Sequence, residues 1–226
     1  SRGNQLGVKN GEIVGEIPGS FVLPTYSNTW GDDAPPLIVL PDDSEVTIDV
    51  VGHDIGLDEP IEDGASVSVF GIGYAVAAEK LTVEPGQEDR VRLGARGAGV
   101  RIATGDGRSA LLFMAKESQD GRHTAVSIET PAIEKGQVLS MDVDAETGEV
   151  DIKIESEEPV EVAVGVEVAD SDGDDKSFQG VVESDGDDAI AVDTSDVGSD
   201  TDTLPVTVDD DGDGMPDQAV DVVPLD

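Results

Sequence analysis

The chain has 226 residues, 51 acidic against 13 basic residues, a formal net charge of -38 and no cysteine. This length allows one large β domain or two small ones, and the lack of cysteine excludes a disulfide scaffold, a thiolate metal site and a cysteine nucleophile. No run approaches the ~20 apolar residues that cross a bilayer, and so negative a charge argues against an electrostatic nucleic-acid binder.

The first 36 residues are interrupted by glycine and proline, and they contain three of the aromatic residues, Phe21, Tyr26 and Trp30. One interpretation is an extended N-terminal arm that docks on a neighbouring molecule through these rings. The other is the first hairpin of the main domain, in which residues 12–17 pair with residues 21–26 across a Pro-Gly turn. Both interpretations stay open at this point.

Short apolar or alternating runs recur from residue 37 onward, at spacings of roughly 8–14 residues and with turn dipeptides between them. This pattern predicts an all-β fold, an antiparallel sandwich or barrel over residues 37–168. Only residues 75–80 leave room for a short helix. The glycines of residues 94–99 lack the Lys-Ser/Thr of a phosphate-binding loop, so we expect a strand turn or a close backbone contact there.

Positive charge is concentrated between residues 90 and 122, the Arg-rich segment. Its basic residues are Arg90, Arg92, Arg96, Arg101, Arg108, Lys116 and Arg122. These side chains either pair with carboxylates of the same chain or form a contact patch for an acidic neighbour, because the arginine fork binds carboxylates in both settings.

Composition changes near residue 168. Residues 169–226 hold 19 acidic residues and one base, Lys176. We therefore predict a separate acidic C-terminal region, either a small β appendage or a linker with an ordered end. The sequence leaves open whether residues 169–203 are ordered.

One motif in this region has the spacing of a calcium loop. Residues 209–217 follow the pattern D-x-D-x-D-G-x-x-D, in which alternate carboxylates converge on one centre and a glycine permits the sharp turn. The predicted ligands are the carboxylates and one backbone carbonyl of Asp209, Asp211, Asp213, Met215 and Asp217. Oxygen donors of this kind suit Ca²⁺, which is the expected cofactor; the alternative is a solvated acidic turn.

These nine residues resemble the calcium loops of thrombospondin type 3 repeats and related EF-hand-like loops. Val220 stands where an EF-hand has its bidentate glutamate, so the affinity should be weaker or a further ligand is needed. The flanking residues alternate like strands, which predicts a clamp between two strands rather than a helix–loop–helix.

The composition as a whole resembles that of salt-adapted proteins of haloarchaea and their viruses. Lysine is scarce, acidic residues abound, and apolar positions hold mainly Val, Ala and Gly. In molar salt the Debye length falls to about 3 Å, so the self-repulsion of such a chain largely disappears.

From these observations we expect a non-enzymatic structural subunit of a halophilic extracellular assembly, such as a virion shell, decoration or tail protein of a haloarchaeal virus. It should form a homo-oligomer and contact subunits of the same assembly through the Arg-rich segment and the N-terminal arm, and it should neither bind nucleic acid nor span a membrane. The two histidines, His53 and His123, lie in no known catalytic or metal motif. The alternative is a secreted or cell-surface calcium-dependent adhesion module of a haloarchaeon.

Overall fold

The computed structural model describes residues 6–9, 12–23, 37–51, 65–81, 85–104, 108–133, 137–144, 146–156, 159–170, 174–184, 188–198, 200–209 and 215–224. Contacts divide the chain into two compact units, residues 1–44 and 45–226, and each is described by itself. The predicted boundary at residue 36 therefore differs from the observed division.

The first unit contains two short antiparallel pairs. The pairs are β1 (Leu6–Lys9) with β2 (Glu12–Gly15), and β3 (Phe21–Leu23) with β4 (Leu37–Val39). The predicted turn forms, with the Ser20 N–H donating to the Ile17 carbonyl at 3.2 Å. The expected hairpin across that turn is wrong, however, because the apolar run of β3 pairs with the equally short apolar run of β4 instead of with β2.

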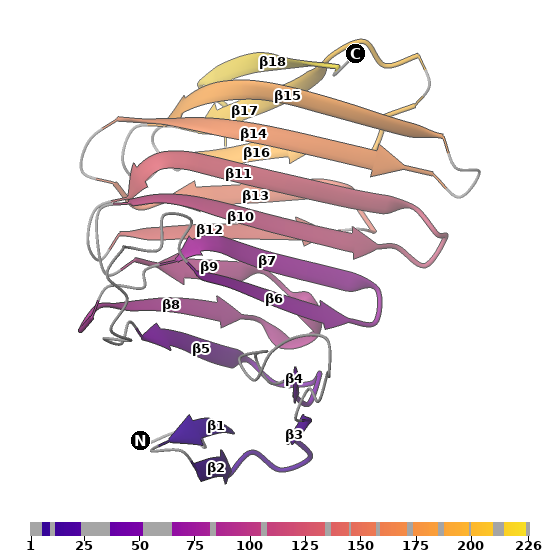
Figure 1. Ribbon diagram of the computed structural model, residues 1–226. Helices are drawn as coiled ribbons and strands as arrows, with labels where there is room; N and C mark the ends of the chain where they lie inside the picture. Colours follow the sequence, from indigo (N-terminus) through magenta and orange to yellow (C-terminus); the bar gives the residue numbers. More distant parts are fainter. Residues whose placement is uncertain are drawn as a thin grey trace, which may run out of the picture. The chain divides into compact units, whose positions relative to one another are not determined.

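The second unit is a single antiparallel sheet of 14 strands that is nearly closed into a barrel (Figure 1). It folds into two layers, each with half of the strands. Layer 1 contains β5 (Val46–Val51), β8 (Glu88–Leu93), β9 (Val100–Ala103), β12 (Val138–Asp144), β13 (Glu149–Ile154), β16 (Ala189–Asp193) and β17 (Leu204–Asp209). Layer 2 contains β6 (Ala65–Gly71), β7 (Tyr74–Leu81), β10 (Arg108–Glu117), β11 (His123–Ile133), β14 (Val160–Ala169), β15 (Asp175–Ser184) and β18 (Gln218–Pro224).

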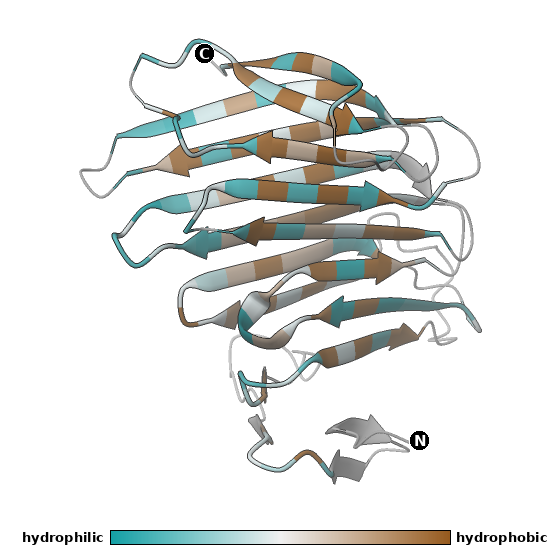
Figure 2. Ribbon diagram, turned by 180° about the vertical axis from the view of Figure 1, so that it is seen from behind, coloured by the Kyte–Doolittle hydropathy of each residue, from teal (hydrophilic) through white to brown (hydrophobic). Residues whose placement is uncertain are grey.

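Strict alternation along the strands builds the core between the layers. In β13, for example, Val150, Ile152 and Ile154 point inward and are at most 1% exposed, while the residues between them are exposed. This two-residue period is what a half-buried strand requires, because successive side chains point to opposite faces. Figure 2 shows the resulting alternation of hydrophobic and hydrophilic positions. The all-β antiparallel prediction is confirmed.

The chain builds the layers by adding hairpins to them alternately. Hairpin β6–β7 lies in layer 2, β8–β9 in layer 1 and β10–β11 in layer 2 again, and each hairpin pairs with the one placed two steps earlier, as β10 does with β7 and β12 with β9. The sequence carries no matching long repeat, because the topology needs only alternating strands and turns.

Two local expectations are settled by the sheet. Residues 75–80 are strand, within β7, and not helix. The glycine-rich segment is a turn between β8 and β9, where a Cβ on Gly97 would come within 2.6 Å of the Tyr74 ring, so the predicted close backbone contact is confirmed.

The boundary predicted at residue 168 falls inside β14. Strands β15, β16 and β17 then continue the same sheet, so the described part of residues 169–226 is not separated from the core. Acidic composition did not prevent strand formation, because the acids within strands such as β15 and β16 point outward, while inward positions such as Val182 and Ile190 stay apolar. No helix of the described residues is long and apolar enough to cross a bilayer.

Candidate functional site

The predicted calcium loop lies at the hairpin where the sheet passes from layer 1 to layer 2. Its first residue, Asp209, ends β17, and the N–H of Asp217 donates to the Val208 carbonyl at 2.8 Å just before β18 begins. Strands flank the loop on both sides, as the alternating flanks predicted.

Two of the predicted ligands, Asp211 and Asp213, lie outside the described residues, whereas Asp209, Met215 and Asp217 lie within them. Among the described residues no group of three or more Asp, Glu or His side chains is arranged to hold a metal ion. Calcium binding therefore stays a prediction from the motif.

Most described basic side chains of the Arg-rich segment contact the chain itself. Arg90 lies 2.7 Å from Asp49 and 2.5 Å from Glu88, and these carboxylates raise its pKa. Lys116 lies 3.2 Å from Asp142, and Arg92 lies 3.5 Å from Glu45.

Two of the arginines remain exposed without an ion pair among the described residues, Arg96 and Arg101. The side chain of Arg108 lies outside the described part. Pairing within the chain is thus confirmed for part of the segment, and the contact patch for an acidic neighbour stays a prediction.

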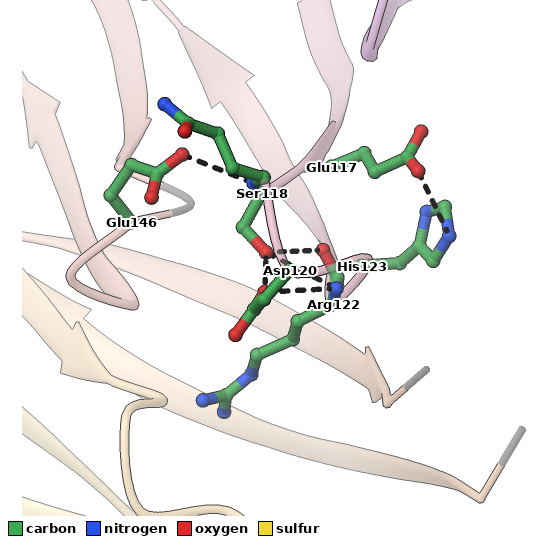
Figure 3. Close-up of polar contacts among 7 residues, drawn as sticks. Glu117, Ser118, Asp120, Arg122, His123 and Glu146 are labelled. Atoms are coloured by element: carbon green, nitrogen blue, oxygen red, sulfur yellow. Dashed lines mark hydrogen bonds and ion pairs between the residues drawn. The ribbon is translucent and has the colours of Figure 1, made fainter. Parts of the chain in front are cut away.

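Arg122 links the two layers at one end of the sandwich. It follows β10 of layer 2, and its guanidinium donates to the backbone carbonyls of Ser195, at 2.8 Å, and Thr194, both just after β16 of layer 1. The turn that carries it is fixed by its own hydrogen bonds, because the Asp120 carboxylate accepts from the Ser118 hydroxyl and from the Arg122 N–H (Figure 3).

Hydrogen bonds to three turn carboxylates lower their pKa values. The Ser118 hydroxyl is the main cause for Asp120, the Glu146 N–H for Asp144 and the Ser195 hydroxyl for Asp193. A carboxylate with a lowered pKa stabilises the fold above the ordinary Asp pKa of about 3.9, and this contribution is lost as the pH falls through its folded value.

His123 lies on the outer face of β11, with its Nε2 4.0 Å from a Glu117 oxygen; both side chains are about half exposed (Figure 3). His53 lies outside the described residues. This pair is open to solvent at the strand ends.

Like charges face one another across the outer surface of layer 1. Asp144 lies opposite Glu149, which lies opposite Asp193, so three neighbouring strands present an acidic row. Asp142 and Asp151 form a second such pair. Facing carboxylates on adjacent strands destabilise a sheet by a few tenths of a kcal/mol to about 1 kcal/mol unless ions screen them.

The outer surface of layer 2 also carries one such pair, Glu161 with Glu183, but it differs in one respect. One row crosses six strands without a single charge; it comprises Ser68, Ala77, Phe113, Ser127, Gly165 and Gln179. We call it the neutral row. This row could not be found from the sequence alone, because its six outward positions become neighbours only through the register of the strands.

An open groove of about 620 Å³ lies where the β6–β7 turn, the β8–β9 turn and the β12–β13 hairpin come together. Tyr74, Arg96 and Lys116 line it together with several carboxylates, among them Asp142 and Glu149. Arg96 has a left-handed backbone, with φ of 55°, which costs energy for a residue with a side chain. The groove mixes both charges and presents one aromatic ring.

No protein-family model matches the chain, and no curated protein or solved structure matches it either.

Proposed function

We propose that this chain is a non-enzymatic structural subunit of an extracellular assembly in high salt, namely a shell, decoration or tail protein of a haloarchaeal virus. In this proposal a divalent cation stabilises the 209–217 loop, and neighbouring subunits meet through their surfaces rather than around a catalytic centre.

The observation that carries the proposal is the neutral row on the outer face of layer 2. A chain with a net charge of -38 has to keep most of its surface away from other acidic surfaces. The neutral row gives layer 2 a strip that can approach another subunit without that repulsion. Protein–protein contacts are typically poor in charged residues and rich in aromatic ones, and this row has no charge and contains Phe113.

The exposed arginines supply the second kind of contact. Arg101 lies on β9, the third strand of layer 1 from the β5 edge, and Arg96 lies at the groove; neither has an ion pair among the described residues. An arginine fork binds carboxylates in pairs of hydrogen bonds, so both side chains suit an acidic neighbour. This is the role we assign to the unpaired part of the Arg-rich segment.

The acidic row on layer 1 supports the high-salt setting. Asp144, Glu149 and Asp193 face one another within one sheet, which is tolerable where concentrated counter-ions screen them. We assign layer 1 to the side of the subunit in contact with brine.

Immunogold electron microscopy with an antiserum against the purified chain tests the proposal. The expected result is regularly spaced label on extracellular particles recovered from culture fluid in molar salt. Label confined to the cell envelope would favour the alternative, a calcium-dependent adhesion module. Label confined to the cell interior would contradict both functions.

A further inference from the structure

Among the described residues, β6 is one of the two edge strands of the 14-stranded sheet, the other being β5. We propose that two copies of this chain pair through β6, antiparallel and across a two-fold axis, so that layer 2 of one copy continues into layer 2 of the other. This inference goes beyond the proposed function, because it holds whether the assembly is a virion, a surface layer or neither.

The first support is hydrogen bonding. Every second residue of an edge strand directs its N–H and C=O away from the sheet, where they can pair with another strand. β6 pairs with β7 on one side, and among the described residues no strand pairs with its other side. Proteins usually protect such an edge with charged residues or proline, and Ala65–Gly71 contains neither.

The second support is charge. β6 is the only described strand of residues 45–226 without an ionisable side chain. The other edge strand, β5, carries Asp49. Two copies of a chain with a net charge of -38 repel each other, so the edge at which they can meet is the neutral one.

The third support is the core, which is incompletely covered at this edge. Val67 and Val69 point into the core from β6 but remain partly exposed, whereas their neighbours on β7, Val76 and Ala78, are 2% and 0% exposed. Beside them Phe70 is 79% exposed on the outer face. A strand added at this edge would cover these side chains on both faces of layer 2.

Symmetry then selects a register. An antiparallel pair of identical strands places one residue on the two-fold axis, and the whole of Ala65–Gly71 pairs only when that residue is Ser68. Val67 of one copy then faces Val69 of the other inside the core. On the outer face Ser66 of one copy faces Phe70 of the other, and the neutral row continues across the axis. The partner is thus a second copy of this chain.

Cysteine cross-linking tests this register directly, because the chain has no cysteine of its own. In Ser68→Cys the two sulfur atoms would face each other across the axis, within disulfide range. In Ser66→Cys, on the same strand and also exposed, the two positions would be about 13 Å apart along the strands, too far for a disulfide. The full-length variants are oxidised in molar KCl and separated on a non-reducing gel.

We expect Ser68→Cys to give a disulfide-linked dimer and Ser66→Cys to remain at least tenfold less linked. Equal linkage of the two variants would indicate random collisions and would overturn the proposal. The proposal would also be overturned if the thiol of Ser68→Cys neither formed a disulfide nor reacted with a maleimide, because another part of the same chain would then cover the edge.

Light scattering provides a test without cysteine. The wild-type chain should have twice its monomer mass of 23.4 kDa in molar KCl. Ser68→Glu, which places two carboxylates on the axis, should weaken dimerisation at least tenfold, while Thr47→Glu, at an exposed position on the other edge strand, β5, should not. The edge pairing would be contradicted if the wild-type chain were a monomer, or if Ser68→Glu had the same dimer dissociation constant as the wild type.

Discussion

The two layers share one core, but their outer faces differ in how charged residues are arranged. Layer 1 presents facing carboxylates, as in Asp142 with Asp151, and arginines that lie close to acidic partners. Layer 2 presents small uncharged residues around Phe113. Layer 2 also carries carboxylates, and Glu161 faces Glu183 across β14 and β15. The contrast therefore lies in the arrangement of the charge, because layer 2 keeps one row across six strands free of it, whereas layer 1 has a row made of carboxylates alone.

Removing salt should have the largest effect, and it should act through layer 1. The Debye length grows from about 3 Å at 1 M to about 30 Å at 0.01 M, so carboxylates that are screened in brine repel one another in dilute buffer. We expect dialysis from molar KCl to ~10 mM to abolish the β signal in far-ultraviolet circular dichroism. A full β spectrum in dilute buffer would contradict the salt-dependence. Sucrose added in place of KCl is the control, since it stabilises without screening.

Removing the cation should have the next largest effect, at the hairpin that joins the layers. A bound ion at 100 times its dissociation constant contributes about 2.7 kcal/mol to the state that binds it. We expect EGTA in molar NaCl to make residues 204–223 sensitive to proteolysis while residues 37–168 stay protected, because β18 meets β15 through only two register pairs of the described residues.

The double variant Asp211→Ala with Asp213→Ala should reproduce the effect of EGTA and should show no further response to the chelator. Tail cleavage that neither EGTA nor the double variant changes would contradict the cation clamp. The Debye length is unaffected by removing trace calcium from molar NaCl, so this experiment separates specific binding from general screening.

The features that can be predicted from the sequence are those that depend on residues close together along the chain. The alternation at Val150 and Ile152, and the strands around the calcium motif, are local patterns, so the all-β class could be inferred from sequence. The pairing of β3 with β4 and the continuation of the sheet past β14 depend on which strands meet, and alternation says nothing about partners. The boundary near residue 168 is predicted from a count of charge along the chain. In the sheet, acidic and apolar residues alternate along each strand and point to opposite faces, so the strands after residue 168 still bury an apolar face.

The same limit applies to the candidate site. The calcium motif is contiguous, so it was visible, although the structure does not describe its centre. The neutral row and the acidic row combine residues from several strands, such as Phe113 with Gly165 and Asp144 with Asp193, and each row exists only once the register is known.

Removing the Arg122 link between the layers should have a smaller but measurable effect. Arg122→Ala leaves the carbonyls of Thr194 and Ser195 without their charged donor, and hydrogen bonds to charged groups contribute about 1.5–3 kcal/mol. We expect the free energy of unfolding, measured in urea at molar KCl, to fall by an amount at the lower end of this range, because the Ser195 contact is exposed.

Arg101→Ala is the control. It removes an exposed arginine of layer 1 that has no ion pair among the described residues, so it should change stability by less than ~0.5 kcal/mol. Equal losses in the two variants would show that Arg122 does not join the layers energetically.

Removing one like-charge pair should have the smallest effect of these changes. The informative result is whether the free energy of unfolding rises or falls. Asp151→Asn removes the carboxylate that faces Asp142 on layer 1, so stability should rise by about 0.2–1 kcal/mol at the lowest salt that keeps the chain folded, and should not change in molar KCl. Urea unfolding at the two salt concentrations measures both values.

Glu79→Gln is the matched control on layer 2. Glu79 faces Leu111, so this variant should show no gain in stability at either salt concentration. A gain of equal size in both variants would mean that net charge alone, and not its crowding on layer 1, sets the salt requirement.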